Sequence, residues 1–287
     1  CDVTSCIDMR TETVMTQLWH GCGAFKKFGM STAEKIFGAD RATLEKYPNY
    51  RNLKYVTVSS PEVVWAYEEA MDLKPEDHIV RPVGVSRTDI FYDENFRKQA
   101  AQKLKEVFPE SEGKKVILYA PTFRGRVKKA KSPGRLDVGY LKALLGDEYV
   151  LVIKHHPFVK KPPAIAAEHQ DFARNVTKTM NIEDLICVSD VCISDYSSLI
   201  FEYALFERPM LFFAYDLDNY FDWRGFYYPY DELAPGPIVT TNKEIVAYIQ
   251  SLKGGFDPTR VRQFKEKFMG ACDGHATEKI LKLLEID

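Results

Sequence analysis

A short polar stretch in the second half of the chain carries side chains suited to holding an anion. It reads Ser194-Asp195-Tyr196-Ser197-Ser198, and its serine hydroxyls can donate to phosphate oxygens. A β-branched apolar run precedes it over 188–193, and apolar residues at helical spacing follow it over 199–205. A strand, a polar turn and a helix in this order place free backbone N–H groups at a helix N-terminus, which attracts anions. The alternative is that Ser194 or Asp195 only caps the helix, and this stretch alone favours neither interpretation.

Two histidines could move a proton or contact an anion. His20 follows an apolar-biased segment, 14–19, and His156 follows the buried strand predicted at 149–154. Imidazole titrates near neutrality, so either residue could act as a general base or acid. The alternative for His20 is a partly buried, hydrogen-bonded histidine, and its local sequence alone favours that role. His155 and His156 are adjacent on an extended segment and point opposite ways, so they would not chelate one metal ion.

Further polar residues stand where other predicted strands end. Thr122 and Arg124 follow the apolar strand predicted at 116–120. These two residues, His20, His156 and the 194–198 turn all fall at the carboxyl ends of predicted strands. Ligands of open α/β sheets bind at that edge, so the coincidence favours a shared binding function for these residues. No cluster has metal-ligand spacing, and we expect neither a metal nor a cofactor. Asp216 and Asp218 are interpreted as a turn or a cap.

Alternating strands and helices must position these side chains. Strands are predicted at 14–19, 53–59, 79–84, 116–120, 149–154, 188–193 and 210–214, and helices at 61–71, 94–107, 136–145, 199–205, 242–252, 260–269 and 277–284. This alternation predicts parallel sheets and an α/β fold. A polar break at 111–115 divides the pattern, so two domains are expected, 1–110 and 111–287.

Composition limits the function classes. The 287 residues carry a net charge of −2, which gives no global electrostatic case for nucleic acid. No apolar run approaches the length of a membrane span, and no signal peptide is recognisable. Six scattered cysteines without Cys-x-x-Cys spacing are interpreted as reduced, which is typical of a cytosolic protein. The first residue is Cys1, which indicates a processed chain or a fragment.

One basic stretch stands out after Arg124. It contains Lys128, Lys129, Lys131 and Arg135, and it is predicted to be a mobile surface loop. Two functional alternatives are a patch for anionic lipid and a patch for a polyanionic acceptor.

Several motifs in one order resemble the CDP-glycerol glycerophosphotransferase family of teichoic acid synthesis, which includes primases and polymerases. The resemblance covers about residues 14–240. The motifs are Gln17-Leu18-Trp19-His20-Gly21 with Lys26 and Lys27, Tyr119-Ala120-Pro121-Thr122-Phe123-Arg124, Lys154-His155-His156-Pro157, the 194–198 turn, Phe213-Ala214-Tyr215-Asp216 with Tyr220, Arg224-Gly225-Phe226, and Pro235-Gly236-Pro237.

The resemblance implies a GT-B architecture, with two Rossmann-like domains facing a central cleft. The N-terminal, acceptor-side domain has fewer strands than the family's and is expected to be incomplete, and the C-terminal domain would bind a CDP-alditol. His20 would be the general base, and His156 would contact the donor phosphates. Ser197 and Ser198 would hold the pyrophosphate. The weaker donor-site candidates implied in this way include Arg124, Asp195 and Arg224.

The implied reaction moves glycerol phosphate from CDP-glycerol to a hydroxyl of a lipid-linked polyol-phosphate or glycan acceptor, with release of CMP. Transfer of ribitol phosphate from CDP-ribitol is an alternative. Two rival functions are a nucleotide-sugar glycosyltransferase and a non-catalytic CDP-alditol-binding domain. A cytosolic donor and a lipid-linked acceptor imply a peripheral enzyme at the inner face of the membrane, attached through Lys128, Lys129 and Lys131.

Overall fold

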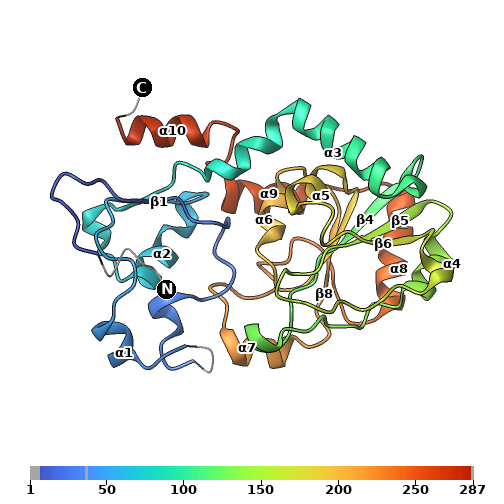
Figure 1. The fold of residues 1–287 in the computed structure, drawn as a ribbon, viewed down its shortest axis with the longest axis horizontal. Coiled ribbons are helices and arrows are strands. Elements are labelled where there is room, and N and C mark those ends of the chain that lie inside the picture. The colour runs from blue at the N-terminus through green and yellow to red at the C-terminus, as the bar shows by residue number, and fades with distance from the viewer. Residues whose placement is uncertain (1–6, 36–37, 286–287) are drawn as a thin grey trace. The chain divides into compact units, whose positions relative to one another are not determined.

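The computed structural model describes residues 7–35 and 38–285, without the side chains of 127 and 221–224 (Figure 1). The chain forms two compact units. Unit 1 contains the residues up to Tyr92 together with Asp216–Leu233 and Phe264–Asp287, and unit 2 contains Asp93–Tyr215 and Ala234–Gln263.

The helices and strands have the following bounds. The strands are β1 Thr16–Gln17, β2 Tyr55–Thr57, β3 Val80–Arg81, β4 Lys115–Tyr119, β5 Tyr149–Ile153, β6 Ala173–Asn175, β7 Val191–Ser194, β8 Met210–Phe213 and β9 Ile238–Val239. The helices are α1 Arg41–Lys46, α2 Val64–Met71, α3 Glu94–Val107, α4 Val138–Leu145, α5 Ile182–Val188, α6 Leu199–Ala204, α7 Leu217–Arg224, α8 Asn242–Ser251, α9 Thr259–Met269 and α10 Ala276–Leu283.

Unit 1 contains a small parallel sheet. Among the described residues it has three strands in the order β1-β2-β3. The C-terminal segments join this unit through Ser59, whose hydroxyl donates to the Phe268 carbonyl at 2.7 Å. Asp89 then accepts the first backbone N–H groups of α10, from Ala276 at 2.9 Å and from Thr277 at 2.7 Å. An acceptor from a distant segment therefore satisfies the start of α10.

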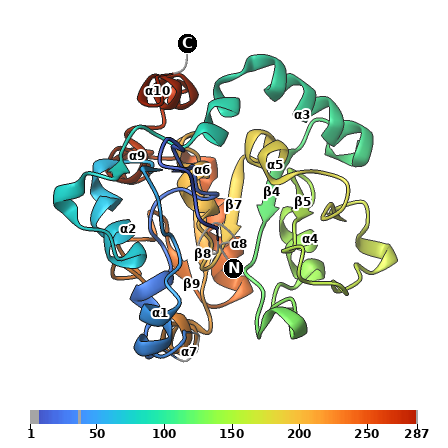
Figure 2. The ribbon, with the colours of Figure 1, turned by 60° about the vertical axis from the view of Figure 1, so that its left-hand side comes forward.

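Unit 2 is built on a parallel sheet of six strands among the described residues, in the order β6-β5-β4-β7-β8-β9. β7, β8 and β9 lie next to one another in Figure 2. The chain reverses its direction of strand addition at β4 and β7, which pair with Tyr119 opposite Ile193. This pair of strands is the topological switch point, where open α/β sheets bind ligands.

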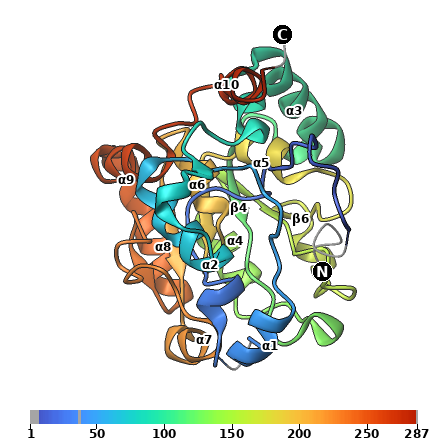
Figure 3. The same cartoon turned by 90° about the vertical axis from the view of Figure 1, so that its left-hand side faces the viewer.

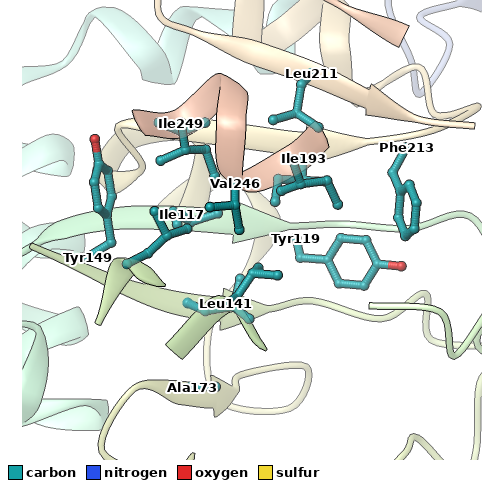
Figure 4. Packing of buried hydrophobic residues seen from close by; sticks show 14 of the residues in the cluster. Ile117, Tyr119, Leu141, Tyr149, Ala173, Ile193, Leu211, Phe213, Val246 and Ile249 are labelled. Carbon is teal, nitrogen blue, oxygen red and sulfur yellow. The ribbon is translucent and has the colours of Figure 1, made fainter. Parts of the chain in front are cut away.

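The core of unit 2 explains why β4, β5 and β7 read as continuous apolar runs. Side chains of these strands pack against α4 and α8, including Leu141 and Ile249, which are 0% exposed (Figure 4). α3 lies alongside α5, as Figures 1 and 3 both show. A parallel sheet covered by helices has no polar face, so its polar side chains lie in the loops at the ends of the strands.

The structure corrects the predicted organisation in several places. The strand expected at 188–193 is Val191–Ser194, because a capping box of Asn181 and Asp184 starts α5, which runs through Cys187 to Val188. β6 and α7 were not predicted. The compact units also differ from a boundary at residue 110, since α3 belongs to unit 2 and the last helix to unit 1.

Two remaining features concern the state of the cysteines and the search for membrane-spanning helices. Cys22, Cys187, Cys192 and Cys272 are buried thiols, and burial raises the pKa of the Cys187 thiol to about 11. Within residues 7–35 and 38–285 we find no helix that combines the length and the apolar character needed to span a bilayer.

Candidate functional site

A buried carboxylate holds the switch point of unit 2 together. Asp195 follows β7, and its Oδ1 accepts the backbone N–H of Thr122 at 2.8 Å and that of Tyr196 at 2.6 Å. Its Oδ2 lies 3.0 Å from Nη1 of Arg124, which also donates to the Thr122 carbonyl at 2.6 Å. The Asp195 side chain is only 3% exposed. Asp195 and Arg124 thus bind each other and fix the loops after β4 and β7.

The hydroxyl groups at this edge have different environments. Ser194 is fully buried, and its hydroxyl donates to the Ala120 carbonyl at 3.4 Å, so it joins β7 to the end of β4. Ser198 is exposed and occupies the N-cap of α6 without a side-chain cap. The predicted alternative of a cap at Ser194 or Asp195 is therefore wrong. Ser197 accepts the Leu199 N–H at 3.3 Å.

Thr122 adds a polar group that lacks a partner. Its Oγ1 is buried and makes no hydrogen bond with any described residue. A buried hydroxyl without a partner costs free energy on the order of 1–3 kcal/mol.

The two adjacent histidines of unit 2 separate into a core residue and a surface residue. His155 is buried, burial lowers its pKa, and its backbone N–H donates to Thr177 Oγ1 at 3.0 Å. His156 is exposed, and its Nδ1 accepts the Phe158 backbone N–H at 3.2 Å. The His156 ring also lies against Phe123 and Phe158, at centroid distances of 4.9 and 4.5 Å. Since Nδ1 is an acceptor, neutral His156 carries its proton on Nε2, where it can donate.

His20 belongs to unit 1 and lies just after β1. Trp19 precedes it with φ of 57°, a left-handed backbone that is costly for a bulky residue. The Trp19 N–H donates to Gln17 Oε1 at 3.1 Å, and its ring lies 4.8 Å from that of Phe28. The His20 ring lies against that of Trp19, with 4.6 Å between the ring centroids and a tilt of 32°. Hydrogen bonding and aromatic packing therefore hold the turn in this unusual conformation.

Arg87 is the residue of this site that sequence reasoning missed. Its Nη1 donates to the His20 carbonyl at 2.6 Å, although 67 positions separate the two residues. Partial burial, and then the positive charge of Arg87, lower the pKa of the His20 imidazole. A lowered pKa favours the neutral imidazole over the imidazolium. No local motif marks Arg87, because its role depends on the fold of unit 1.

The predicted candidates thus fall into two groups. Unit 2 brings together Thr122, Arg124, Ser194, Asp195, Ser197 and Ser198 at the switch point, with His156 at the end of the neighbouring β5. Unit 1 holds His20. The side chain of Arg224 lies outside the described residues. Within the described part of the chain no group of three or more His, Cys, Asp or Glu could hold a metal ion.

Two parallel sheets, one with polar side chains at its carboxyl edge, define a protein of the α/β class. The family model described as CDP-glycerol:poly(glycerophosphate) glycerophosphotransferase matches residues 2–286, and the chain belongs to this family.

Known proteins agree with this assignment. The teichoic acid ribitol-phosphate primase of Bacillus spizizenii (strain ATCC 23059 / NRRL B-14472 / W23) is 37% identical over 278 residues, covering 96% of this chain and 70% of the primase. The teichoic acid poly(ribitol-phosphate) polymerase of the same strain is also 37% identical, but the chain spans only 44% of its length. A solved structure of the wall teichoic acid polymerase TagF is 25% identical with a TM-score of 0.81, over 96% of this chain and 68% of TagF. The GT-B-like α/β fold predicted from the sequence is confirmed.

Replacing Asp195 tests how much its contact with Arg124 stabilises the switch point. Asp195→Asn removes the charge that faces Arg124, whose side chain is 20% exposed. We expect the free energy of unfolding to fall by about 2–5 kcal/mol, because a largely buried guanidinium loses its counter-charge. Urea unfolding followed by far-UV circular dichroism measures the change.

A matched control is Asp137→Asn in the same unit. Asp137 is an exposed N-cap whose carboxylate accepts the Tyr140 N–H at 2.9 Å. Asparagine caps helices as well as aspartate does, so the change should stay below about 0.5 kcal/mol. Equal losses in both variants would contradict a special role for Asp195.

Replacing Arg87 tests the electrostatic environment of His20. Arg87→Gln removes a positive charge that disfavours the imidazolium, so the pKa of His20 should rise. Arg87→Lys keeps the charge and should give a smaller rise. NMR titration of the imidazole, assigned by comparison with His20→Gln, measures the pKa. An unchanged value in Arg87→Gln would leave burial as the only cause.

Proposed function

We propose that the chain transfers a polyol phosphate from a CDP-polyol to a hydroxyl of a teichoic acid or capsule-type acceptor and releases CMP. The switch point of unit 2 carries this proposal, because the Asp195 carboxylate there binds both the loop after β4 and the turn that contains Ser197 and Ser198. The hydroxyls of this turn can donate to a donor phosphate. Family membership supports the same class of reaction.

The chemistry follows from the roles that these residues can take. Neutral His20 takes the proton of the acceptor hydroxyl, whose oxygen attacks the phosphorus that carries the polyol. A new P–O bond to the acceptor forms while the bond from that phosphorus to the bridging oxygen breaks. CMP leaves with the bonding electrons.

Negative charge that builds on the departing CMP must be offset. The hydroxyls of Ser197 and Ser198 and the backbone N–H groups of their turn can donate to phosphate oxygens. The Nε2–H of His156 can donate there as well, and it does so without needing a positive charge. These groups form the donor-phosphate site of the proposal.

Two donors fit the proposal. CDP-glycerol is the predicted donor and the one that the family description names. CDP-ribitol is the second candidate, because the two relatives at 37% identity are named ribitol-phosphate enzymes. The acceptor in this proposal is a lipid-linked polyol-phosphate or glycan chain, so the enzyme works at the inner membrane face.

CMP release from CDP-glycerol and from CDP-ribitol, with a short lipid-linked polyol-phosphate acceptor, tests the function. Acceptor-dependent release from one donor supports the proposal and identifies the polyol. Release from UDP-hexoses alone would indicate a glycosyltransferase. Donor binding without CMP release from any acceptor would indicate a binding domain.

His20→Ala should lower kcat by roughly 10²–10⁴-fold, because the acceptor hydroxyl loses its base. Protection of the chain by the donor against heat unfolding should persist. His275→Ala serves as the control, since His275 is exposed and pairs with Glu278 far from any candidate residue in the sequence. Unchanged turnover in His20→Ala would overturn the assignment of the base.

A further inference from the structure

The basic stretch after Arg124 has a defined structure. Arg124 and Lys131 form an antiparallel bridge, with backbone hydrogen bonds of 2.9 Å from Arg124 N to Lys131 O and 3.0 Å in the other direction. Lys129 N donates to Arg126 O at 2.8 Å inside the turn. The stretch predicted as a mobile loop is thus a closed hairpin. We refer to residues 124–135 as the basic hairpin.

The start of the basic hairpin is attached to the switch point of unit 2. Arg124 closes the hairpin with its backbone while its side chain binds Asp195 and the Thr122 carbonyl. The same Asp195 carboxylate accepts the N–H of Tyr196, at the start of the candidate phosphate-binding turn. One arginine therefore connects the hairpin to that turn.

The far end of the hairpin is attached as well. The Tyr215 hydroxyl donates to the Pro133 carbonyl at 3.4 Å, and the Arg135 guanidinium lies 5.6 Å from the centre of the Tyr215 ring. Asn242 donates to the Arg135 carbonyl at 3.0 Å. Tyr215 follows β8 and Asn242 begins the helix after β9, so both anchors lie at the carboxyl edge of the sheet. The hairpin is fixed along the edge where the donor would bind.

The charged side chains of the basic hairpin are all positive. Residues 124–136 contain six cations and no aspartate or glutamate. The cations beyond Arg124 are exposed, and none of them forms an ion pair with a described residue: Arg126, Lys128, Lys129, Lys131 and Arg135. Like charges within one short hairpin repel one another, and a bound polyanion would relieve that repulsion.

We infer that the basic hairpin binds the phosphodiester groups of a polyol-phosphate acceptor chain next to the donor. This inference rests on the proposed function. A polyol-phosphate chain carries one negative charge for each unit, so several units can face several lysines at once. The anchoring through Arg124 and Asp195 keeps these lysines beside the donor turn.

A lipid surface suits the hairpin less well. Peripheral membrane segments combine cations with bulky apolar side chains that enter the bilayer. Between residues 125 and 135 the sequence contains no aromatic residue, leucine, isoleucine or methionine. Charge without an apolar anchor favours a soluble polyanion.

The test variant replaces Lys128, Lys129 and Lys131 with glutamine. The control variant replaces Lys98, Lys105 and Lys253 with glutamine as well. The side chains of these lysines are 77%, 53% and 59% exposed. Lys105 and Lys253 pair with Glu112 and Glu148, which precede β4 and β5, so both lie at the opposite edge of the sheet. The two variants change the net charge equally.

Binding is measured first, without turnover, by fluorescence anisotropy with lipid-free polyol-phosphate oligomers at low and physiological ionic strength. The test variant should bind a long oligomer at least roughly tenfold more weakly at low salt, with a flatter salt dependence. The affinity for a single polyol-phosphate unit should hardly change, and neither should the protection against heat unfolding that a CDP-polyol provides. The control variant should resemble the wild type in every assay.

The outcomes separate this inference from the proposed function. Equal oligomer binding by the test variant and the wild type would overturn the inference. Loss of binding to vesicles of anionic phospholipid, with oligomer binding intact, would assign the hairpin to lipid and overturn it too. If no donor supports CMP release but the oligomer affinity still depends on these lysines, the proposed function fails and the binding surface stands.

Discussion

The buried carboxylate of Asp195 is the interaction on which the candidate site depends. A carboxylate that is 3% exposed is stable only when its oxygens are bonded. Two backbone N–H groups and one guanidinium meet this need, and they come from the loops after β4 and β7. The charge therefore fixes the loops relative to each other. The orphan hydroxyl of Thr122 and the exposed hydroxyl of Ser198 lie at positions set by this one group.

Arginine has a comparable double role in each unit. Arg124 binds Asp195 through its side chain and closes the basic hairpin through its backbone. Arg87 binds the His20 carbonyl, which orients the turn, and its charge helps to lower the pKa of the imidazole. In both cases a long, permanently charged side chain links two segments that lie far apart in the sequence. Each arginine fixes geometry and local electrostatics together.

The sequence predicted most of what depends on local pattern. α3 was predicted to the residue, and strands were predicted at or near β4, β5, β7 and β8 because continuous burial leaves continuous apolar runs. Errors arose where a local signal competed with that pattern. Val188 reads as strand, but the capping box at Asn181 starts a helix that includes it. Arg87 and the attachment of α10 through Asp89 could not be predicted, because both join segments far apart in the sequence.

The two candidate histidines, His20 and His156, show why residue type alone did not assign roles. The prediction that His156 contacts the donor phosphates requires a hydrogen-bond donor on its ring. The Phe158 N–H occupies Nδ1, so the neutral ring already presents an N–H at Nε2. His20 faces the opposite requirement, since only its neutral form can accept a proton, and burial together with Arg87 favours that form. In the proposed reaction one histidine thus accepts a proton and the other donates a hydrogen bond.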